Sequence, residues 1–363
     1  MRICFIGPAN SAHIIKWCTW FNGRGHETHV ISFTLGEILN TEVHLINIGV
    51  DVNGSDVGKL KYLTTGRKIK QLVDEIRPDI VNVHYATSYG MAVALSGIKK
   101  YVLSVWGSDI YDFPQRSLLH KALLKYSLWK APYLFSTSRA MAQEAAQYTK
   151  KSFEITPFGV DMALFNPDKR TRIPEDGDFL VGTVKGLSDK YGIADILRAV
   201  AYIRKEGFIP IRLRIAGKGP QEQKYMTLAR ELGIEDITCW LGFISQERAA
   251  QEWANMDVAL IPSTSESFGV SAVEAQACGT AVIVSCIPGL MEATDPGNSS
   301  IVVHRNHPEE IADGIRTLID DTVRKQFAVR GLEYVHKNYE INHCFKKIEA
   351  AFEQIIDSEG SKA

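Results

Sequence analysis

The chain lacks several features that would each assign it to a class of protein. No uninterrupted apolar stretch of its 363 residues approaches the roughly 20 residues of a membrane span. The first residues, Met1 to Gly7, predict a strand. They do not predict a secretory signal, because a signal needs a longer apolar core and a small-residue cleavage site. The six cysteines are scattered without a C-x-x-C pair. We therefore expect reduced thiols in a cytosolic protein, and neither a disulfide framework nor a zinc site.

Motifs for nucleotides and metals are also missing or incomplete. No G-x-G-x-x-G follows the first strand, which argues against a Rossmann dehydrogenase. The segment Gly217-Lys-Gly219 lacks the context of a phosphate loop, so ATP hydrolysis is not expected. The only Asp-x-Asp, Asp176-Gly-Asp178, precedes a strand in a polar run. That position predicts a solvated turn at the wrong end of a sheet, with a metal-bridging role as the alternative.

The length of the chain and the distribution of its charges indicate its domain organisation and its possible partners. The length predicts two domains, each large enough for its own core. Residues 1–165 hold 18 Lys and Arg against 13 Asp and Glu, and the remainder holds 23 against 29. A basic first half favours contact with something anionic, and a chance drift of surface composition is the other interpretation.

Short apolar strands alternate with helical patterns along nearly the whole chain, which predicts parallel sheets built from βα units. The break between two series lies near residues 156–161 and the polar run 165–178. The expected strands of the first series are residues 2–6, 29–33, 43–47, 80–84, 101–105 and 133–136. Those of the second are residues 179–184, 211–215, 237–241, 258–261, 281–284 and 300–303.

Two glutamates bracket the most informative segment, Glu266-Ser-Phe-Gly-Val-Ser-Ala-Val-Glu274. Glu266 lies in a loop after the strand 258–261, and Glu274 lies inside a helix that ends at Gly279. Between them, the backbone N–H groups of Phe268, Gly269, Val270 and Ser271 stand at a helix N-terminus, which favours an anion. Because carboxylates hold sugar hydroxyls, the segment suggests a sugar nucleotide. Eight helical residues rise about 12 Å, more than the roughly 5–9.5 Å of a glycosidase pair.

This segment resembles the E-x(7)-E motif of glycosyltransferase family 4, the retaining transferases of GT-B fold. The match extends from Asp257 through Cys278-Gly-Thr to Pro288-Gly-Leu. The alternative is an ordinary strand-loop-helix with solvated glutamates. The resemblance implies an α/β fold with two Rossmann-like, doubly wound domains facing a cleft. It implies an acceptor-side domain over 1–160, a nucleotide-sugar domain over 161–340, and a helix over 341–363 that returns to the first domain.

The resemblance also implies roles in the second domain. Glu266 should hold hydroxyls of the donor sugar, Glu274 the ribose, and the backbone of 268–271 the sugar and phosphate. The phrase from Val184 to Ile193 resembles G-R-L-x(3)-K-G, which assigns the diphosphate to Lys185 and Lys190. Lys185 replaces the usual arginine and Tyr191 the usual glycine, and solvated surface lysines are the alternative. The phrases around Gly217 and around Phe243 and Ile244 also resemble family phrases. By this resemblance, Phe243 and Ile244 should lie beside the base.

In the first domain, Gly7 and Asn10 lie in the loop after the first strand, which would face the donor phosphates. Asn10 or Ser11 can cap the following helix. His13 could reach the cleft, but a lone histidine there is more often a packing residue. Asp109 follows Trp106, which replaces the family's histidine, and is either a catalytic candidate near the acceptor or a helix N-cap.

The reaction implied is transfer of a hexosyl unit from a nucleoside-diphosphate sugar to an acceptor hydroxyl in glycan, polysaccharide or glycolipid biosynthesis. The resemblance implies retention, favours UDP over GDP, and leaves no cofactor or metal to be expected. The alternatives are a sugar-nucleotide epimerase of the same fold and a non-catalytic module that binds sugar nucleotides or glycans. No nucleic-acid partner is expected.

The run 116–130 is basic and apolar on a helical period. It can lie on an anionic membrane at the inner face, which would suit a lipid-linked acceptor instead of a free sugar. A core-facing helix with solvated lysines is the other interpretation.

Overall fold

The computed structural model of the chain describes residues 1–48, 64–172, 178–207 and 209–360. It divides into two compact units. Unit 1 comprises Met1–Phe158 with Phe345–Ala363, and unit 2 comprises Gly159–Cys344. The first division falls two residues before the expected boundary at 160, and the second falls at Phe345, four residues after the expected start of the returning helix.

Unit 1 is built on a parallel sheet of seven strands in the order β3-β2-β1-β4-β5-β6-β7. Its strands are β1 (Arg2–Ile6), β2 (Glu27–Ser32), β3 (Thr41–Leu45), β4 (Ile80–His84), β5 (Val102–Val105), β6 (Tyr133–Ser136) and β7 (Glu154–Ile155). Its helices are α1 (Ala12–Gly23), α3 (Gly66–Ile76), α4 (Ser88–Ser96), α5 (Ser108–Tyr111), η2 (Phe113–Gln115), α6 (Leu118–Lys130), α7 (Arg139–Ala145) and α15 (Ile341–Gly360), whose first residues belong to unit 2.

Unit 2 contains a parallel sheet of six strands in the order β10-β9-β8-β11-β12-β13. Its strands are β8 (Phe179–Val184), β9 (Ile211–Ala216), β10 (Thr238–Gly242), β11 (Val258–Ile261), β12 (Ala281–Ser285) and β13 (Ser300–Val303). Its helices are η3 (Pro167–Lys169), η4 (Asp189–Tyr191), α8 (Ile193–Glu206), α9 (Glu222–Glu231), η5 (Glu235–Ile237), α10 (Gln246–Asn255), α11 (Val270–Ala277), α12 (Pro288–Ala293), α13 (Pro308–Ile319) and α14 (Asp321–Tyr339).

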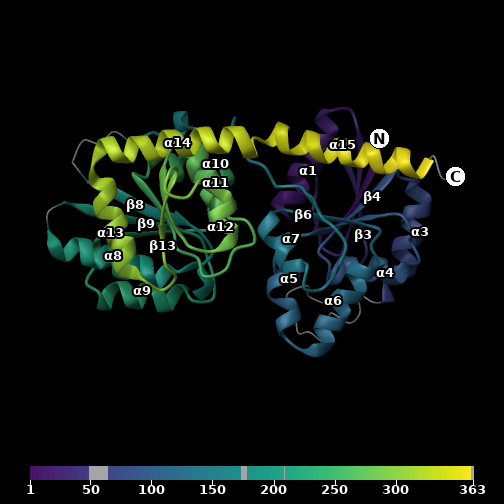
Figure 1. Cartoon of the computed structure of the whole chain (residues 1–363), viewed down its shortest axis with the longest axis horizontal. Helices are drawn as coiled ribbons and strands as arrows, with labels where there is room; N and C mark the ends of the chain where they lie inside the picture. Colours follow the sequence, from purple (N-terminus) through teal and green to yellow (C-terminus); the bar gives the residue numbers. More distant parts are fainter. Residues whose placement is uncertain (49–63, 173–177, 208, 361–363) are drawn as a thin grey trace. The chain divides into compact units, whose positions relative to one another are not determined.

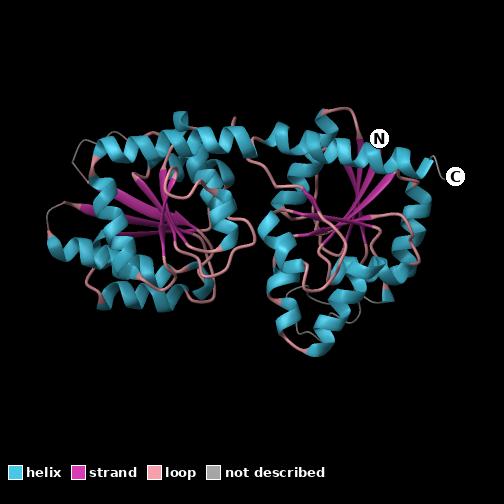
Figure 2. Ribbon diagram, in the orientation of Figure 1, coloured by secondary structure: helices cyan, strands magenta, loops and turns pink. Residues whose placement is uncertain are grey.

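Both sheets have the doubly wound order 3-2-1-4-5-6, extended by β7 in unit 1. Helices cover both faces of each sheet, as Figures 1 and 2 show. The central strands, such as β4, β11 and β12, are therefore buried on both sides and appear as continuous apolar runs in the sequence, whereas the edge strands β3, β7 and β10 are partly exposed. The predicted α/β class and the doubly wound order are confirmed. The strand β7 was missed, because two residues give no periodic pattern.

Helix α15 attaches the end of the chain to unit 1 (Figure 1). Phe345 and Phe352 are fully buried. Phe345 lies 5.5 Å from the Trp17 ring of α1, and Phe352 stacks 5.8 Å from Phe21. Glu349, on the same face of the helix, accepts hydrogen bonds from Arg24. The C-terminal helix that the resemblance implied thus returns to the first domain, as expected.

Candidate functional site

The candidate site lies at the carboxyl edge of the unit 2 sheet. Strands β8 and β11 are neighbours there, although they are first and fourth along the chain. The connections on either side of this pair run in opposite directions, which makes it the switch point where open α/β sheets bind ligands. Lys185 follows β8 directly, and Glu266 lies in the loop after β11.

Lys185 and Glu266 form an ion pair at this switch point. The Lys185 Nζ atom lies 2.5 Å from Glu266 Oε1, and the two side chains are 12% and 11% exposed. Ser263, itself buried, donates a hydrogen bond of 3.1 Å to the same oxygen. Burial acts to lower the pKa of the Lys185 ammonium, but the Glu266 carboxylate outweighs it and the pKa is raised. Lys185 is therefore a fixed cation at neutral pH.

The loop after β8 brings the second lysine to the same place. The Lys185 and Lys190 Nζ atoms lie 4.7 Å and 5.2 Å from the centroid of the Tyr191 ring. The backbone N–H of Thr264 donates to the Lys190 carbonyl at 2.8 Å, which joins this loop to the one after β11. Lys190 is exposed, so its amine can move toward a ligand.

A glycine follows Tyr191 and supplies the conformation that the family phrase needs. Gly192 has φ +69°, and a Cβ there would come 2.3 Å from the Pro262 carbonyl oxygen. The glycine expected at position 191 thus stands one residue later.

The N-terminus of α11 opens beside this pair. Gly269 caps the helix with φ +101°, a conformation that favours glycine. The Phe268 side chain is buried against Tyr339, at 4.9 Å, and so only its backbone can serve a ligand. The Ser271 hydroxyl donates to the Val184 carbonyl at 3.4 Å. Glu274 lies in α11, is partly exposed, and is among the charges that raise the pKa of Lys185.

Glycines allow the loops after neighbouring strands to touch. Gly217 has φ +141°, and a Cβ there would lie 1.9 Å from the Lys185 carbonyl oxygen. Its N–H donates to Gly242 at 2.7 Å, while Leu187 donates to Lys218 at 3.1 Å. The loops after β8, β9 and β10 are therefore tied together by backbone hydrogen bonds, and Lys185 stands on this frame.

Phe243 and Ile244 follow β10, two strands away from β8 on the same edge. The Phe243 side chain is 81% exposed, whereas Ile244 is partly buried against the core. An exposed aromatic ring at this edge offers a flat surface for a base.

Gly289 is a residue of the site whose role the sequence did not indicate. A Cβ there would lie 2.4 Å from the Glu266 carbonyl oxygen. The start of α12 therefore supports the backbone that carries Glu266. The phrase Pro288-Gly-Leu was recognised as part of the family pattern, but its contact spans more than twenty residues of sequence.

The first-domain residues lie at the carboxyl edge of the unit 1 sheet. Gly7 follows β1, and a Cβ there would meet Ile14 and His84 at 3.1 and 3.3 Å. Asn10 is exposed and accepts a hydrogen bond from the Thr34 hydroxyl. Of the two predicted caps, Ser11 caps α1, through the N–H of His13.

His13 packs among aromatic rings. Its ring stacks 3.8 Å from Phe158 and lies 5.4 Å from Trp106. Burial lowers the pKa of His13 to about 3, so it is neutral at physiological pH. These contacts agree with the packing interpretation.

The Asp109 side chain is buried, and its carboxylate is already engaged in hydrogen bonds. It lies in the first turn of α5 and is 1% exposed. Its carboxylate accepts backbone N–H groups of Ala86, Trp106 and Gly107 at 2.9, 3.2 and 2.8 Å. Burial raises its pKa although these donors act against that. Gly107 is the N-cap of α5 and no side chain caps this helix, so the N-cap alternative for Asp109 is wrong. Its carboxylate instead joins the backbone after β4 to the backbone after β5.

His84 is a buried residue of this edge that the sequence analysis did not select. It ends β4, next to β1, and neither ring nitrogen has a hydrogen-bond partner in the described part of the chain. Its neighbour Tyr85 has φ +69°, which is unusual for a residue with a side chain. The sequence did offer one signal for His84, because it is a polar residue at the carboxyl end of a buried strand.

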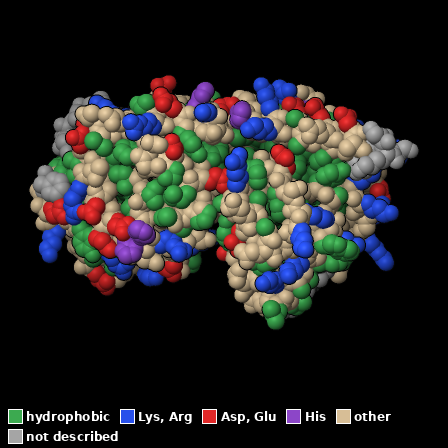
Figure 3. All heavy atoms as spheres, in the orientation of Figure 1, with side chains coloured by type: hydrophobic (Ala, Val, Ile, Leu, Met, Phe, Trp, Pro, Cys, Tyr) green, Lys and Arg blue, Asp and Glu red, His purple; other side chains and the backbone are tan. Residues whose placement is uncertain are grey.

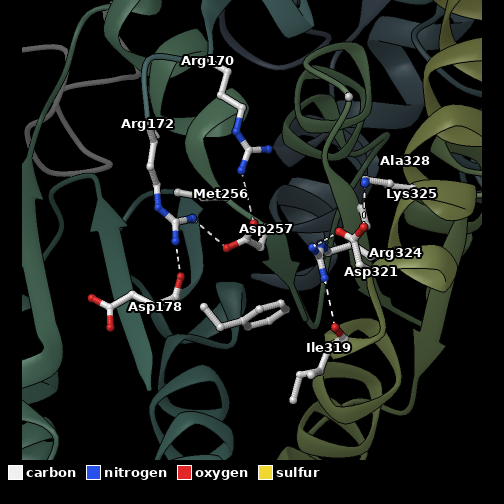
Figure 4. A pocket seen from close by; sticks show the side chains of 13 residues that line it. Arg170, Arg172, Asp178, Met256, Asp257, Ile319, Asp321, Arg324, Lys325 and Ala328 are labelled. Atoms are coloured by element: carbon white, nitrogen blue, oxygen red, sulfur yellow. Dashed lines mark hydrogen bonds and ion pairs between the residues drawn. The ribbon is translucent and has the colours of Figure 1, made fainter. Parts of the chain in front are cut away.

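A hollow at the opposite, amino edge of the unit 2 sheet is lined by paired charges (Figure 4). Arg170 and Arg172 both point to Asp257, at 3.4 and 2.7 Å. Asp178 pairs with Arg212 at 2.9 Å, while Asp176 lies outside the described residues. Each labelled carboxylate there has a cationic partner, which indicates a structural network.

Two further features concern metal ligands and membrane spans. Within the described ranges, one group of His and Glu side chains could hold a metal, and it belongs to unit 1, whereas Lys185 belongs to unit 2. Across the same part of the chain, no helix combines the length and hydrophobicity needed to cross a bilayer.

Two family profiles match the chain. Glycosyl transferases group 1 match residues 166–332, and glycosyl transferase 4-like proteins match residues 2–138. The D-inositol 3-phosphate glycosyltransferase of Pseudarthrobacter chlorophenolicus is 31% identical over 53% of this chain and 48% of its own length. The chain thus matches about half the length of that relative. N-acetyl-alpha-D-glucosaminyl L-malate synthase of Bacillus anthracis is 24% identical over 92% of this chain and 90% of its own.

Solved structures share the fold over the whole chain. Sucrose-phosphate synthase from Thermosynechococcus elongatus superposes with a TM-score of 0.85 at 17% identity, covering 99% of this chain and 100% of that one. HepE from Anabaena, crystallised with UDP and glucose, gives 0.81 at 19% identity, covering 97% and 99%. The fold, the two profiles and the E-x(7)-E segment agree. The chain belongs to glycosyltransferase family 4 and has the GT-B fold.

Proposed function

We propose that this enzyme transfers a hexosyl unit from a UDP-sugar to an acceptor hydroxyl, with retention of anomeric configuration and without a metal ion. The observation that carries the proposal is the buried Lys185–Glu266 pair beside the start of α11. It combines a permanent cation, a carboxylate and the N–H groups of a helix N-terminus at a switch point. A diphosphate needs the first and last of these, and a sugar needs the second.

Lys185 would neutralise the diphosphate leaving group. Its raised pKa keeps the amine protonated throughout the reaction. Lys190 and the N–H groups of 268–271 would add to the same positive field, because they meet at one edge of the sheet. Charge placed in advance around a departing oxygen lowers the barrier without reorganisation during the step.

Glu266 would orient the sugar and would not attack it. One of its oxygens already accepts from Ser263 and faces the Lys185 ammonium. The reaction would then be a displacement on one face of the sugar. The bond between the anomeric carbon and the diphosphate oxygen breaks, the acceptor oxygen bonds to that carbon, and the departing phosphate oxygen takes the acceptor proton.

UDP is proposed as the nucleotide for two reasons. The structurally similar HepE was crystallised with UDP and glucose. In addition, the 81% exposed Phe243 ring can stack on a small base at this edge. Glu274 would hold the ribose.

A lipid-linked acceptor is proposed from the surface of α6. Leu124 and Leu128 of this helix face the core, whereas Leu118, Leu119 and Trp129 are 87%, 65% and 64% exposed. Figure 3 shows hydrophobic and basic side chains together where α6 begins. Such a surface suits the interface of an anionic membrane.

Turnover by single variants tests the proposal. We expect Lys185→Ala and Glu266→Gln to lower transfer or donor hydrolysis by about a hundredfold to a thousandfold, the effect of removing one electrostatic contact at a transition state. The matched controls Lys224→Ala and Glu235→Gln change exposed residues of the same unit and should keep full activity.

The same assay distinguishes the alternatives. Activity should persist in EDTA, and the product should keep the anomeric configuration of the donor by NMR. Full activity in both site variants would contradict the site assignment. An epimerised nucleotide sugar formed without acceptor would instead indicate an epimerase, and tight UDP binding without turnover a binding module.

A further inference from the structure

Strands β2 and β3 carry two histidines and a glutamate on one face of the unit 1 sheet. The strands are parallel, with His29 opposite Glu42 and Ile31 opposite His44. Because side chains two apart on a strand share a face, Glu42 and His44 lie on the face that also carries His29. β3 is the edge strand of this sheet in the described ranges.

The ligand atoms converge. His29 Nδ1 lies 3.3 Å from His44 Nε2 and 3.6 Å from Glu42 Oε2, and His44 Nε2 lies 3.9 Å from Glu42 Oε1. Two nitrogen ligands of a tetrahedral zinc ion, each about 2.0–2.1 Å from the metal, stand roughly 3.3 Å apart. The spacing of the two rings is therefore that of one edge of such a site.

A second carboxylate fixes the orientation of His29. Glu27 Oε1 lies 2.9 Å from His29 Nε2, and Glu27 Oε2 accepts from Arg2 Nε at 2.8 Å. The proton on Nε2 is thus held by Glu27, which leaves the Nδ1 lone pair facing His44. A carboxylate on the remote nitrogen is the usual support of a metal-bound histidine.

Burial gives the site a rigid side and an open side. The His29 and His44 side chains are 10% and 17% exposed, whereas Glu42 is 67% exposed. The two imidazoles are held in place, and the glutamate can swing onto an ion from solvent. A fourth position would remain for water.

We propose that His29, His44 and Glu42 bind one divalent transition-metal ion of the zinc, nickel or copper class, as a clip between β2 and the edge strand β3. Two imidazoles and one carboxylate select these ions over Mg²⁺ and Ca²⁺, which prefer oxygen ligands. The clip lies in unit 1, and so the proposed metal-independent transfer at Lys185 does not depend on it. It departs from the sequence-based expectation that the chain binds no metal.

Zinc titration of the untagged full chain, stripped with a chelator and dialysed, tests the proposal. We expect one equivalent of Zn²⁺ to bind in competition with a chromophoric chelator and to raise the melting temperature. Cu²⁺ in place of zinc should show two imidazole nitrogens by electron paramagnetic resonance.

Variants assign the ion to its ligands. His44→Ala should lose the equivalent and the thermal shift, and Glu27→Gln should weaken binding about tenfold to a hundredfold. His304→Ala is the matched control, because it removes an exposed histidine paired with Glu310 and should change nothing. Circular dichroism without metal shows whether His44→Ala folds. Retention of the full equivalent by folded His44→Ala, or no binding by the wild type, would overturn the proposal; a plain hydrogen bond between the rings would then explain their spacing.

Discussion

At the scale of single residues, glycines help to set the geometry of the site in addition to its charged side chains. Lys185 is placed by the backbone that follows β8, and that backbone is contacted by Gly217 across a gap too small for any side chain. The position of Lys185 therefore depends on a glycine more than thirty residues away. The same holds for Glu266 and Gly289.

The substitution Gly217→Ala tests this dependence. Its Cβ would lie 1.9 Å from the Lys185 carbonyl, and so the loop must shift and donor binding should be lost together with some stability. Gly233→Ala is the control, since it shares a positive φ but has no atom within 4 Å of the added Cβ. It should cost only about 1–2 kcal/mol of unfolding free energy and no activity. Equal effects of the two variants on donor binding would contradict the role of the close contact.

His84 predicts how stability depends on pH. Burial lowers its pKa to about 3 in the folded chain, against about 6.5 in the unfolded one. Between these values the unfolded chain binds a proton that the folded chain excludes. The free energy of unfolding should thus fall as pH falls from 6.5 toward 3, by up to about 1.4 kcal/mol per pH unit.

Chemical unfolding at pH 7 and pH 5 measures this effect. His84→Phe removes the titrating group from among Phe5, Trp17 and Trp106, and so its stability should depend less on pH. His336→Ala, an exposed control, should behave as the wild type. An unchanged pH dependence in His84→Phe would show that another group is responsible.

At the scale of elements, α15 contributes to the stability of unit 1. Phe352→Ala empties a site between Phe21 and Phe135, whose rings both lie 5.8 Å away, and should cost about 3–5 kcal/mol of unfolding free energy. Lys346→Ala changes the exposed side of the helix and is the control. Urea denaturation followed by circular dichroism gives both values. A Phe352→Ala loss below that of Lys346→Ala would mean that the helix does not support the unit.

The elements were largely predictable from the sequence, and the contacts between them were not. Strands buried on both faces, such as 80–84 and 258–261, appear as apolar runs, so their type and place could be predicted. The two-residue β7 carries no such signal. Motif resemblance indicated Lys185 and Glu266 separately, but their ion pair joins residues far apart in sequence. The approach of His29 to His44 depends on strand register, which no local pattern reports.

At the scale of the whole molecule, the basic first half and the exposed surface of α6 predict membrane binding. We expect the protein to float with vesicles of anionic phosphatidylglycerol and not with phosphatidylcholine, and to be released by salt, because each nearby Lys or Arg contributes about 1 kcal/mol. Replacing Leu118 and Trp129 by Gln should reduce flotation. Leu35→Gln, at another exposed leucine of unit 1, should not. Equal flotation of all three proteins would indicate that α6 is only a solvated domain helix.

The central claim is that amines and helix N–H groups of unit 2 bind a nucleoside diphosphate without a divalent ion. Calorimetric titration of UDP in EDTA tests it most directly. We predict binding by the wild type and by Lys224→Ala, and binding about tenfold to a hundredfold weaker by Lys185→Ala, the range of a charge-assisted hydrogen bond. Binding that appears only with Mg²⁺, or equal affinity in wild type and Lys185→Ala, would contradict it.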